Sequence, residues 1–458
     1  MSLEKARRQK TEQLVLPLYG RGEAPKSQRS GEASTATNGN ERPGTDRLME
    51  EVVQRGNAKA ALKRVMANKG SPGVDGMTVE ELPKYLVENW ERIREELLAG
   101  TYQPKPVKRQ EIPKSGGGVR ELGIPCALDR FVQQAILQVL QPRFDPTFSE
   151  YSYGSRPGRS AHEAVCTAQR YVREGRHIVA DVDLAKFFDR VCHDVLVGKL
   201  AERIKDKRML GLIRRYLEAG VMVHGVVVER FEGTPQGGPL SPLLANVLLD
   251  EVDKELEKRG HAFVRYVDDC NVYVRSQRAG DDVMATLRRL YARLRLQVNE
   301  TKSAVAPAWT RKFLGYSFWM SKEQTVKRCV APKALAAMRE RVREITSRGG
   351  GRSMKAICAE LRAYLTGWKA YFRLSEMPSV FCDLDRWIRH RLRMVQLKQW
   401  KRGTTVYRKL RARGVPERDA QGAATHARRW WKTSMHKALH IAMPTSYFDR
   451  MGVPRLGG

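Results

Sequence analysis

Two adjacent aspartates interrupt an alternating apolar pattern in the middle of the chain. Residues 263–275 read FVRYVDDCNVYVR, with apolar side chains alternating on both sides of Asp268 and Asp269. Such alternation around a tight turn predicts a β-hairpin that packs on one face and carries the two carboxylates at its tip. Asp is a common turn former, so an ordinary Asp-Asp turn is the alternative interpretation. Because neighbouring carboxylates repel each other, we expect a cation to hold them.

A second acidic cluster lies upstream, in a segment that reads as a buried strand. Residues 177–189, HIVADVDLAKFFD, carry Asp181 and Asp183 among apolar side chains and lead into a helical pattern. Burying a carboxylate in a strand is costly unless it is paired or binds a metal. Oxygen ligands without a nearby His or Cys cluster favour Mg²⁺, with Mn²⁺ as a substitute, over zinc. The two clusters predict one site that binds two ions and catalyses nucleotidyl transfer.

Several further motifs resemble those of group II intron-encoded reverse transcriptase/maturases, in the same order. YVDD (266–269) resembles the Y-x-D-D box of reverse transcriptases, 181–188 their first aspartate motif, and GTPQGGPLSPLLANVLLDEVDKEL (233–256) their template-and-nucleotide motif. Further matches lie at 67–78, 112–136, 153–165, 296–305, 313–318 and 364–372. The resemblance runs from about residue 50 to the C-terminus, and the ordered set is far more specific than the box alone. It implies a bacterial enzyme of this family without the C-terminal endonuclease.

The resemblance implies an α+β fold, a right-hand polymerase with fingers and a split β-α-β palm followed by an all-α thumb/maturase domain. We expect four regions: a disordered basic segment (1–45), an N-terminal extension with fingers (46–170), the palm (171–330), and the helical thumb/maturase with a basic C-terminal region (331–458). Helices are predicted at 47–56, 61–70, 90–100, 281–296, 332–345, 353–372 and 382–402, and short strands around the glycine turn 115–118.

The resemblance also implies roles for the acidic residues. Asp183 and Asp268 are expected to bind both ions, with Asp269 closer to the primer terminus. Asp181 competes with Asp183 for the first role. The expected metal ligands are therefore Asp183, Asp268, Asp269 and the backbone near Val182 or Leu184.

Six residues match the family's nucleotide-binding positions. Phe188 is expected to exclude a ribose 2′-hydroxyl, although core packing is the alternative and Phe187 is the better core residue. Arg suits a triphosphate because its planar fork donates two parallel hydrogen bonds. Lys302 is expected at the leaving pyrophosphate, with an ordinary surface lysine as the alternative. A helix is predicted to begin with Ser241 as N-cap and Pro242 in its first turn. The nucleotide contacts are Lys114, Arg120, Phe188, Gln236, Gly237 and Lys302.

The charge of the chain points to a polyanionic partner. Lys and Arg total 83 against 51 Asp and Glu, a formal charge of +32. We expect an RNA template, a DNA or RNA primer, dNTPs and group II intron RNA as partners. A membrane is disfavoured because no apolar run approaches the roughly 18 residues needed to span one. Scattered cysteines and the lack of a signal peptide favour a cytoplasmic, nucleoid-associated protein, whose oligomeric state stays open.

One late helix predicts a nucleic-acid contact. Ile388, Leu392 and Val395 recur at helical spacing, and three arginines are expected on the opposite face, against phosphate or simply in solvent. The predicted nucleic-acid contacts are Arg386, Arg389, Arg393 and, in the second fingers block, Arg156. Trp430 and Trp431 allow base stacking, but core packing is favoured.

Val267 departs from the family, whose intron-encoded members usually have Ala there. The change affects packing and not metal ligation, so polymerase activity is expected to survive. Three biological roles stay open: an intron-encoded enzyme that is also a maturase in retrohoming, an intron-free reverse transcriptase in DNA repair or phage defence, and an RNA-binding splicing factor with a relic palm. Complete carboxylates argue against the third.

Overall fold

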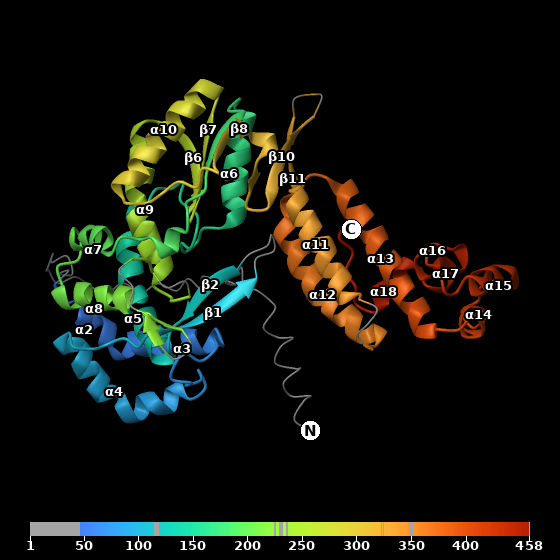
Figure 1. Cartoon of the computed structure of the whole chain (residues 1–458), viewed down its shortest axis with the longest axis horizontal. Coiled ribbons are helices and arrows are strands. Elements are labelled where there is room, and N and C mark those ends of the chain that lie inside the picture. Colours follow the sequence, from blue (N-terminus) through green and yellow to red (C-terminus); the bar gives the residue numbers. More distant parts are fainter. Residues whose placement is uncertain are drawn as a thin grey trace, which may run out of the picture. The chain divides into compact units, whose positions relative to one another are not determined.

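The computed structural model describes residues 46–113, 119–223, 226–228, 232–234, 237–321, 323, 325–347 and 351–457 (Figure 1). The segment 1–45, predicted to be disordered, and the glycine turn 115–118 lie outside the described residues. The described residues form a mixed α+β fold in which a helical region follows the sheets, as the sequence predicts.

The first region combines helices with a four-stranded sheet of order β2-β1-β4-β5. Leu82, Leu86, Ile93 and Leu97 form the buried stripe of α4, which ends at Gly100 in the left-handed conformation. The sheet crosses the predicted boundary at residue 170, because β1 pairs in parallel with β4. The elements are α2 (Leu48–Val53), α3 (Arg55–Ala67), α4 (Leu82–Ala99), β1 (Val107–Pro113), β2 (Val119–Ile124), α5 (Ala127–Phe144), η1 (Asp145–Thr147), β4 (Val221–Val223) and β5 (Val226–Val228).

A second sheet, called here the central sheet, has the antiparallel order β6-β7-β3-β8. Alternate strand residues enter two cores: Ala180 and Val272 pack with α9 and α10, whereas Val179 and Tyr273 pack with α6. Both faces of the sheet are therefore covered. The elements are α6 (Ala161–Arg173), β3 (Ile178–Val182), η2 (Phe187–Asp189), α7 (His193–Ala201), α8 (Lys207–Glu218), α9 (Ser241–Lys258), β6 (Ala262–Tyr266), β7 (Asp269–Val274), α10 (Gln277–Arg293) and β8 (Ala304–Pro307).

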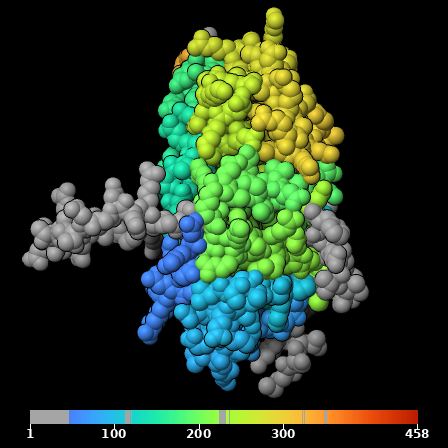
Figure 2. Space-filling view, turned by 90° about the vertical axis from the view of Figure 1, so that its left-hand side faces the viewer, coloured from blue at the N-terminus to red at the C-terminus, as the bar shows by residue number. Residues whose placement is uncertain are grey.

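Helices from distant parts of the sequence form one continuous surface. In Figure 2, α4 (light blue) lies below α7 and α8 (green), which lie below α9 and α10 (yellow-green). Each helix in this series contacts the next. These contacts connect the first region to the central sheet.

The remaining elements are a small sheet of order β11-β10-β9 and a run of helices. The helices predicted at 332–345, 353–372 and 382–402 are confirmed within a few residues. The elements are η3 (Ala308–Thr310), β9 (Lys312–Phe313), β10 (Tyr316–Met320), β11 (Val326–Val330), α11 (Pro332–Ile345), α12 (Met354–Tyr371), η4 (Phe372–Leu374), α13 (Pro378–Trp400), α14 (Gly403–Arg411), α15 (Glu417–Thr425), α16 (Trp430–Thr433), α17 (Lys437–Ala442) and α18 (Thr445–Arg450).

Candidate active site

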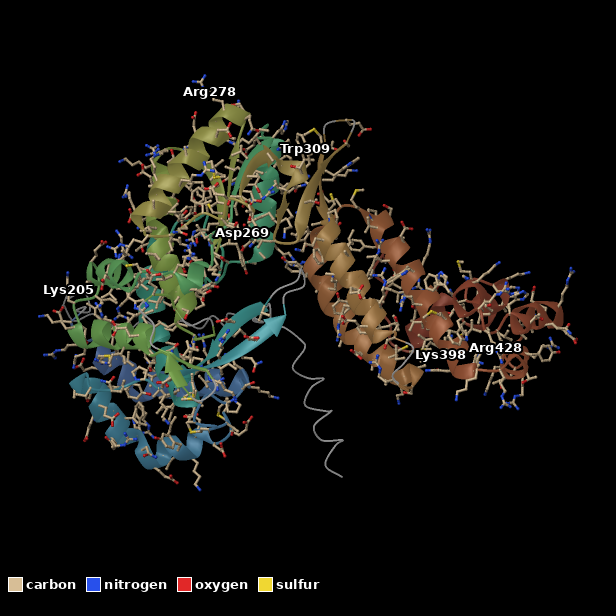
Figure 3. All side chains as sticks on the ribbon, viewed as in Figure 1. Lys205, Asp269, Arg278, Trp309, Lys398 and Arg428 are labelled. Atoms are coloured by element: carbon tan, nitrogen blue, oxygen red, sulfur yellow. The ribbon has the colours of Figure 1, made fainter. Side chains whose placement is uncertain are left out.

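The predicted hairpin is present, and its turn is displaced by one residue. Tyr266 pairs with Asp269, so Val267 and Asp268 form the two-residue turn and Asp269 begins β7. Figure 3 shows Asp269 at this end of the central sheet. Val267 has a φ of +60°, a left-handed conformation that a β-branched residue adopts at a cost of about 1–3 kcal/mol. The surroundings of the turn must therefore hold it in place.

Asp183 lies beside this turn because of the strand register. β3 pairs antiparallel with β7, and the last pair is Val182 with Cys270, so Asp183 follows directly at the edge that carries Asp268 and Asp269. The backbone nitrogen of Asp183 donates to Ser303 Oγ at 3.0 Å, and its carbonyl accepts from Asn299 N at 2.8 Å. Its side chain is 42% exposed. The carboxylate can therefore reach a ligand.

Asp181, the competing residue, is occupied by protein groups. Arg311 Nε and Nη2 donate to Asp181 Oδ2 at 2.8 and 2.6 Å, and the Asn271 amide, turned to face it, donates to Oδ1 at 3.0 Å. Burial raises the pKa of Asp181, and the Arg311 guanidinium opposes that shift. Asp181 is therefore held by protein groups, whereas Asp183 is the more exposed of the two carboxylates.

The carboxylates affect one another strongly. Burial, followed by the charges of Asp181, Asp268 and Asp183, raises the pKa of Asp269 to about 8. Lys302 Nζ lies 3.3 Å from Asp183 Oδ1 and supplies one positive charge. Within the described residues, no three His, Cys, Asp or Glu side chains are already arranged around one metal position. An oxygen-only donor set whose members repel one another nevertheless fits a hard divalent cation, which would relieve the repulsion.

Family comparisons agree with this geometry. Residues 112–318 match the model described as reverse transcriptase (RNA-dependent DNA polymerase), and residues 335–414 match the group II intron, maturase-specific domain. The chain contains a reverse transcriptase domain followed by a group II intron maturase-specific domain. The first match contains all four strands of the central sheet, at whose end the carboxylates lie, and the second runs from within α11 to just beyond α14.

Several proteins are similar to parts of the chain. Protein YkfC of Escherichia coli strain K12 is 38% identical over 220 residues, which cover 46% of this chain and 58% of YkfC. The group II intron-encoded protein LtrA of Lactococcus lactis subsp. cremoris is 37% identical over 195 residues, 42% of this chain and 32% of LtrA. The chain thus matches less than two thirds of the length of either relative. A chain of the solved partial Cas6-RT-Cas1--Cas2 complex is 24% identical with a TM-score of 0.35, covering 54% of this chain and 42% of that one.

The reverse transcriptase domain brings the first aspartate motif against the template-and-nucleotide motif. Phe187 is buried and Phe188 is half-buried, with ring centroids 5.0 Å apart. The Phe188 carbonyl accepts a hydrogen bond from Thr234 N at 2.6 Å. A Cβ on Gly233 would lie 2.9 Å from the same carbonyl, so the close approach requires glycine. Phe187 is thus the core residue, as predicted, and the gating role of Phe188 stays a prediction.

The predicted triphosphate contacts are described only in part. Lys114 and Gln236 lie outside the described residues, and for Arg120 the structure describes the backbone alone, paired with Ile112. Gly237 has a φ of +135°, and a Cβ there would lie 2.6 Å from the Gly123 carbonyl oxygen. The template-and-nucleotide motif therefore lies directly against β2.

The helix within this motif begins one residue earlier than predicted. Leu240 is the N-cap of α9, Ser241 is its first residue, and Pro242 lies in the first turn as expected. Thr234 Oγ1 donates to Ser241 Oγ at 3.0 Å. The hydroxyl of Ser241 thus binds the preceding loop instead of capping the helix.

Three of the four residues predicted to contact nucleic acid are buried in the structure. Arg389 and Arg393 are 2% and 4% exposed. Arg389 pairs with Asp385 at 2.7 Å, and Arg393 Nε donates to the Met443 carbonyl at 3.0 Å. The helices after α13 cover this face, which helical periodicity alone could not indicate. Arg156 is also buried, pairing with Asp145 at 2.8 Å and donating to the carbonyls of Ser149 and Ser152.

Arg386 and Trp431 are exposed, whereas Trp430 packs partly buried against the helical core, as the favoured interpretation predicted. The Arg386 side chain is 80% exposed and pairs with Asp383 at 3.0 Å. Trp431 is 44% exposed with its ring 3.7 Å from that of His390, so its predicted core packing is wrong. Trp430 is half-buried, with Lys398 Nζ 5.6 Å from its ring.

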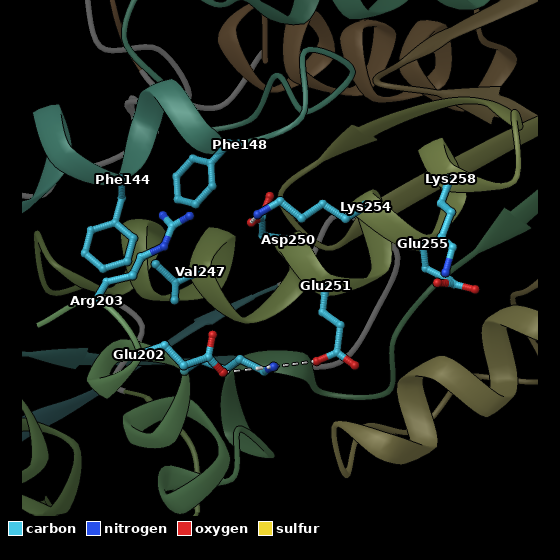
Figure 4. Close-up of a pocket in the computed structure, with 11 residues that line it drawn as sticks. Phe144, Phe148, Glu202, Arg203, Val247, Asp250, Glu251, Lys254, Glu255 and Lys258 are labelled. Carbon is cyan, nitrogen blue, oxygen red and sulfur yellow. Dashed lines mark hydrogen bonds and ion pairs between the residues drawn. The ribbon is translucent and has the colours of Figure 1, made fainter.

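The pocket in Figure 4 is separate from the carboxylates. It has a volume of about 310 Å³ and is lined by Phe144, Phe148 and charged side chains of α7 and α9. Lys199 pairs with Glu251 at 2.9 Å and with Glu202 at 3.4 Å. Four basic and four acidic side chains line the pocket, so their formal charges balance.

No helix of the described residues has the length and apolar character needed to cross a membrane.

Sequence reasoning missed two residues that support the site, Arg311 and Arg265. The available signal for Arg265 was a lone charge at a position of β6 whose neighbours alternate between two buried cores.

Proposed function

We propose that the chain is an RNA-directed DNA polymerase that copies RNA into cDNA with two Mg²⁺ ions. The observation that carries the proposal is the meeting of Asp183 and Asp268 at adjacent strand ends, in a domain that matches reverse transcriptases. When bound, divalent ions would stabilise the charge that develops on the attacking and leaving oxygens.

The residues of the chain divide the remaining work. Asp183, Asp268 and Asp269 would supply the oxygen ligands. The ion pair between Asp181 of β3 and Arg311 would hold the strand that precedes Asp183 in place. Lys302 lies close enough to Asp183 to neutralise phosphate charge beside the metal ligands. Phe188 and Gly237 would contact the incoming nucleotide.

A first prediction tests the ligands. Asp183→Asn and Asp268→Asn each remove a negatively charged oxygen, so Mg²⁺-dependent cDNA synthesis should fall at least about 100-fold, because metal catalysis contributes several kcal/mol. RNA affinity should stay nearly unchanged, since no phosphate contact is lost. Primer extension and filter binding on the same proteins measure both. Asp281→Asn, at an exposed position of α10, is the matched control. Synthesis by either active-site variant at the control's level would refute the assignment.

A second function is supported by the match of residues 335–414 to the group II intron maturase-specific domain. The chain would bind group II intron RNA and assist its splicing. Deleting the catalytic carboxylates should not affect this activity, because RNA binding needs no metal chemistry. Splicing of a group II intron transcript with Asp268→Asn tests it, and loss of splicing in parallel with cDNA synthesis would contradict an independent maturase function.

A further inference from the structure

A buried arginine lies directly behind the catalytic turn. Arg265 and Asp253 are both fully buried, and Arg265 Nε donates to the two carboxylate oxygens of Asp253 at 2.8 and 3.0 Å. Arg265 Nη2 also donates to Asp253 Oδ2, at 2.5 Å. The other terminal nitrogen, Nη1, donates to Asn246 Oδ1 at 2.9 Å and to the Val267 carbonyl at 2.8 Å. One planar side chain thus joins helix α9 to the peptide immediately before Asp268.

A glycine also approaches the turn closely. Asn246 Nδ2 donates to the Gly154 carbonyl at 3.0 Å. A Cβ on Gly154 would overlap the backbone nitrogen of Val267, so the segment at 154 lies in direct contact with the turn. Arg265 also fixes this segment, because its backbone nitrogen donates to the Tyr151 carbonyl at 2.9 Å. The Val267 peptide is therefore restrained by two contacts.

This restraint acts on a conformation that Val267 does not adopt readily. Val267 has a positive φ, and the surrounding contacts must maintain it. Asn246 and Asp253 both belong to α9, which forms the C-terminal part of the template-and-nucleotide motif. A shift of α9 would therefore move the Val267 carbonyl and, with it, Asp268.

We propose that Arg265, Asp253, Asn246 and Gly154, the turn-holding network, are positioning residues that set the location of Asp268 relative to α9. The network does not touch substrate. It keeps the metal-binding carboxylate and the template-and-nucleotide motif in one rigid arrangement, which active-site geometry demands to within roughly 0.5 Å. This inference rests on the proposed polymerase function.

Three variants disturb the network at different points. Asn246→Ala removes the link between α9 and both backbone segments but keeps the Arg265–Asp253 pair. Gly154→Ala pushes directly on the turn. Arg265→Lys keeps a charge but loses the planar fork that reaches Val267, Asn246 and Asp253 together. Arg208→Lys is the matched control, because Arg208 also joins an aspartate (Asp206, 2.9 Å) and a carbonyl (Leu98, 3.2 Å) far from the turn.

Mn²⁺ binding without substrates, followed by electron paramagnetic resonance, gives a readout besides activity, and Asp268→Asn defines its background. We expect Asn246→Ala and Gly154→Ala to weaken Mn²⁺ binding several-fold and to lower kcat of single-nucleotide addition at least about tenfold, since small displacements of reacting groups cost up to about 100-fold. Excess metal should restore part of kcat. Primer–template affinity and the control variant should stay within about twofold of wild type.

Circular dichroism and thermal unfolding show which variants fold. If folded Asn246→Ala and Gly154→Ala both bind Mn²⁺ and add nucleotides like wild type, the proposal is wrong. If kcat falls while Mn²⁺ binding is unchanged, the network does not act through Asp268 and the proposal is also wrong. A wild-type chain that binds Mn²⁺ but extends no primer refutes the polymerase function, and the Mn²⁺ titrations still decide the role of the network.

Discussion

Phe188 lies half-buried beside the carboxylates, and its carbonyl is held by the loop of the template-and-nucleotide motif. If its ring blocks a 2′-hydroxyl, Phe188→Ala should increase ribonucleotide incorporation relative to deoxynucleotide incorporation by about 10-fold or more, because a lost steric contact is worth ~1–3 kcal/mol of discrimination. Incorporation assays with matched dNTP and rNTP pairs measure the ratio. Phe187→Ala, in the buried neighbour, should lower stability without this gain, and an equal gain from both variants would remove the role from Phe188.

Two arginines of α13 that the sequence placed on one face of the helix differ in burial. Arg389 is buried with Asp385, whereas Arg386 is exposed with Asp383. Removing one partner of a buried ion pair costs about 3–5 kcal/mol, and a surface pair contributes about 0–1 kcal/mol. Arg389→Ala should therefore markedly lower the free energy of unfolding in urea, and Arg386→Ala should leave it nearly unchanged. Equal effects would contradict the burial of Arg389.

At the scale of elements, Asp129 of α5 joins two other segments. Its carboxylate accepts hydrogen bonds from Tyr102 Oη at 2.8 Å, Lys105 N at 3.2 Å and Tyr216 Oη of α8 at 3.4 Å. Burial raises the pKa of Asp129 from 3.8 to about 6. The folded chain therefore holds this proton more tightly than the unfolded chain. The contribution of protonated Asp129 to the free energy of unfolding is fully present below pH 3.8 and is lost as the pH rises through about 6.

Asp129→Asn, which cannot titrate, tests this coupling. The difference in unfolding free energy between Asp129→Asn and wild type should shift in favour of the variant between about pH 4 and 7, by up to roughly 3 kcal/mol. Urea unfolding at several pH values measures it. Asp206→Asn, at a buried aspartate whose pKa is lowered, should favour wild type as the pH rises. A pH-independent difference for Asp129→Asn would show that the carboxyl does not titrate with folding.

At the scale of the whole molecule, the formal charge of +32 predicts binding that weakens steeply with salt. With Arg389 and Arg393 buried, the exposed cations after α13 are better candidates for phosphate contacts. They include Arg408, Lys409 and Arg428, the last of which is labelled in Figure 3. Reversing these three charges should reduce the log–log salt slope by about 0.7–0.9 per lost contact, equally for unrelated RNA sequences. Salt titrations of RNA binding measure the slope, and an unchanged slope would place the contacts elsewhere.

Local pattern alone determined much of this protein. Alternation around Asp268 predicted the hairpin, helical periodicity predicted α11 to α13, and the ordered motifs predicted a reverse transcriptase domain with a maturase-specific domain. The hairpin and the helices depend on short-range periodicity, which is visible in a single sequence, whereas the domains were implied by the resemblance of the ordered motifs to a known family. The expectation that one of the two upstream aspartates lies near the hairpin end also followed, because a carboxylate on a buried strand needs a partner, but the choice of Asp183 over Asp181 rested on the family resemblance.

Tertiary structure decided what contacts each charged side chain. Asp181 lies within β3 and Asp183 directly follows it, and only the position of Arg311 and Asn271 shows which carboxylate is held by protein groups and which is accessible. The covering of α13, which buries Arg389, comes from residues some 60 positions later in the chain. The support that Arg265 gives to Val267 likewise depends on α9. Burial and long-range hydrogen bonds are properties of packing between distant segments, so periodicity within one segment cannot specify them.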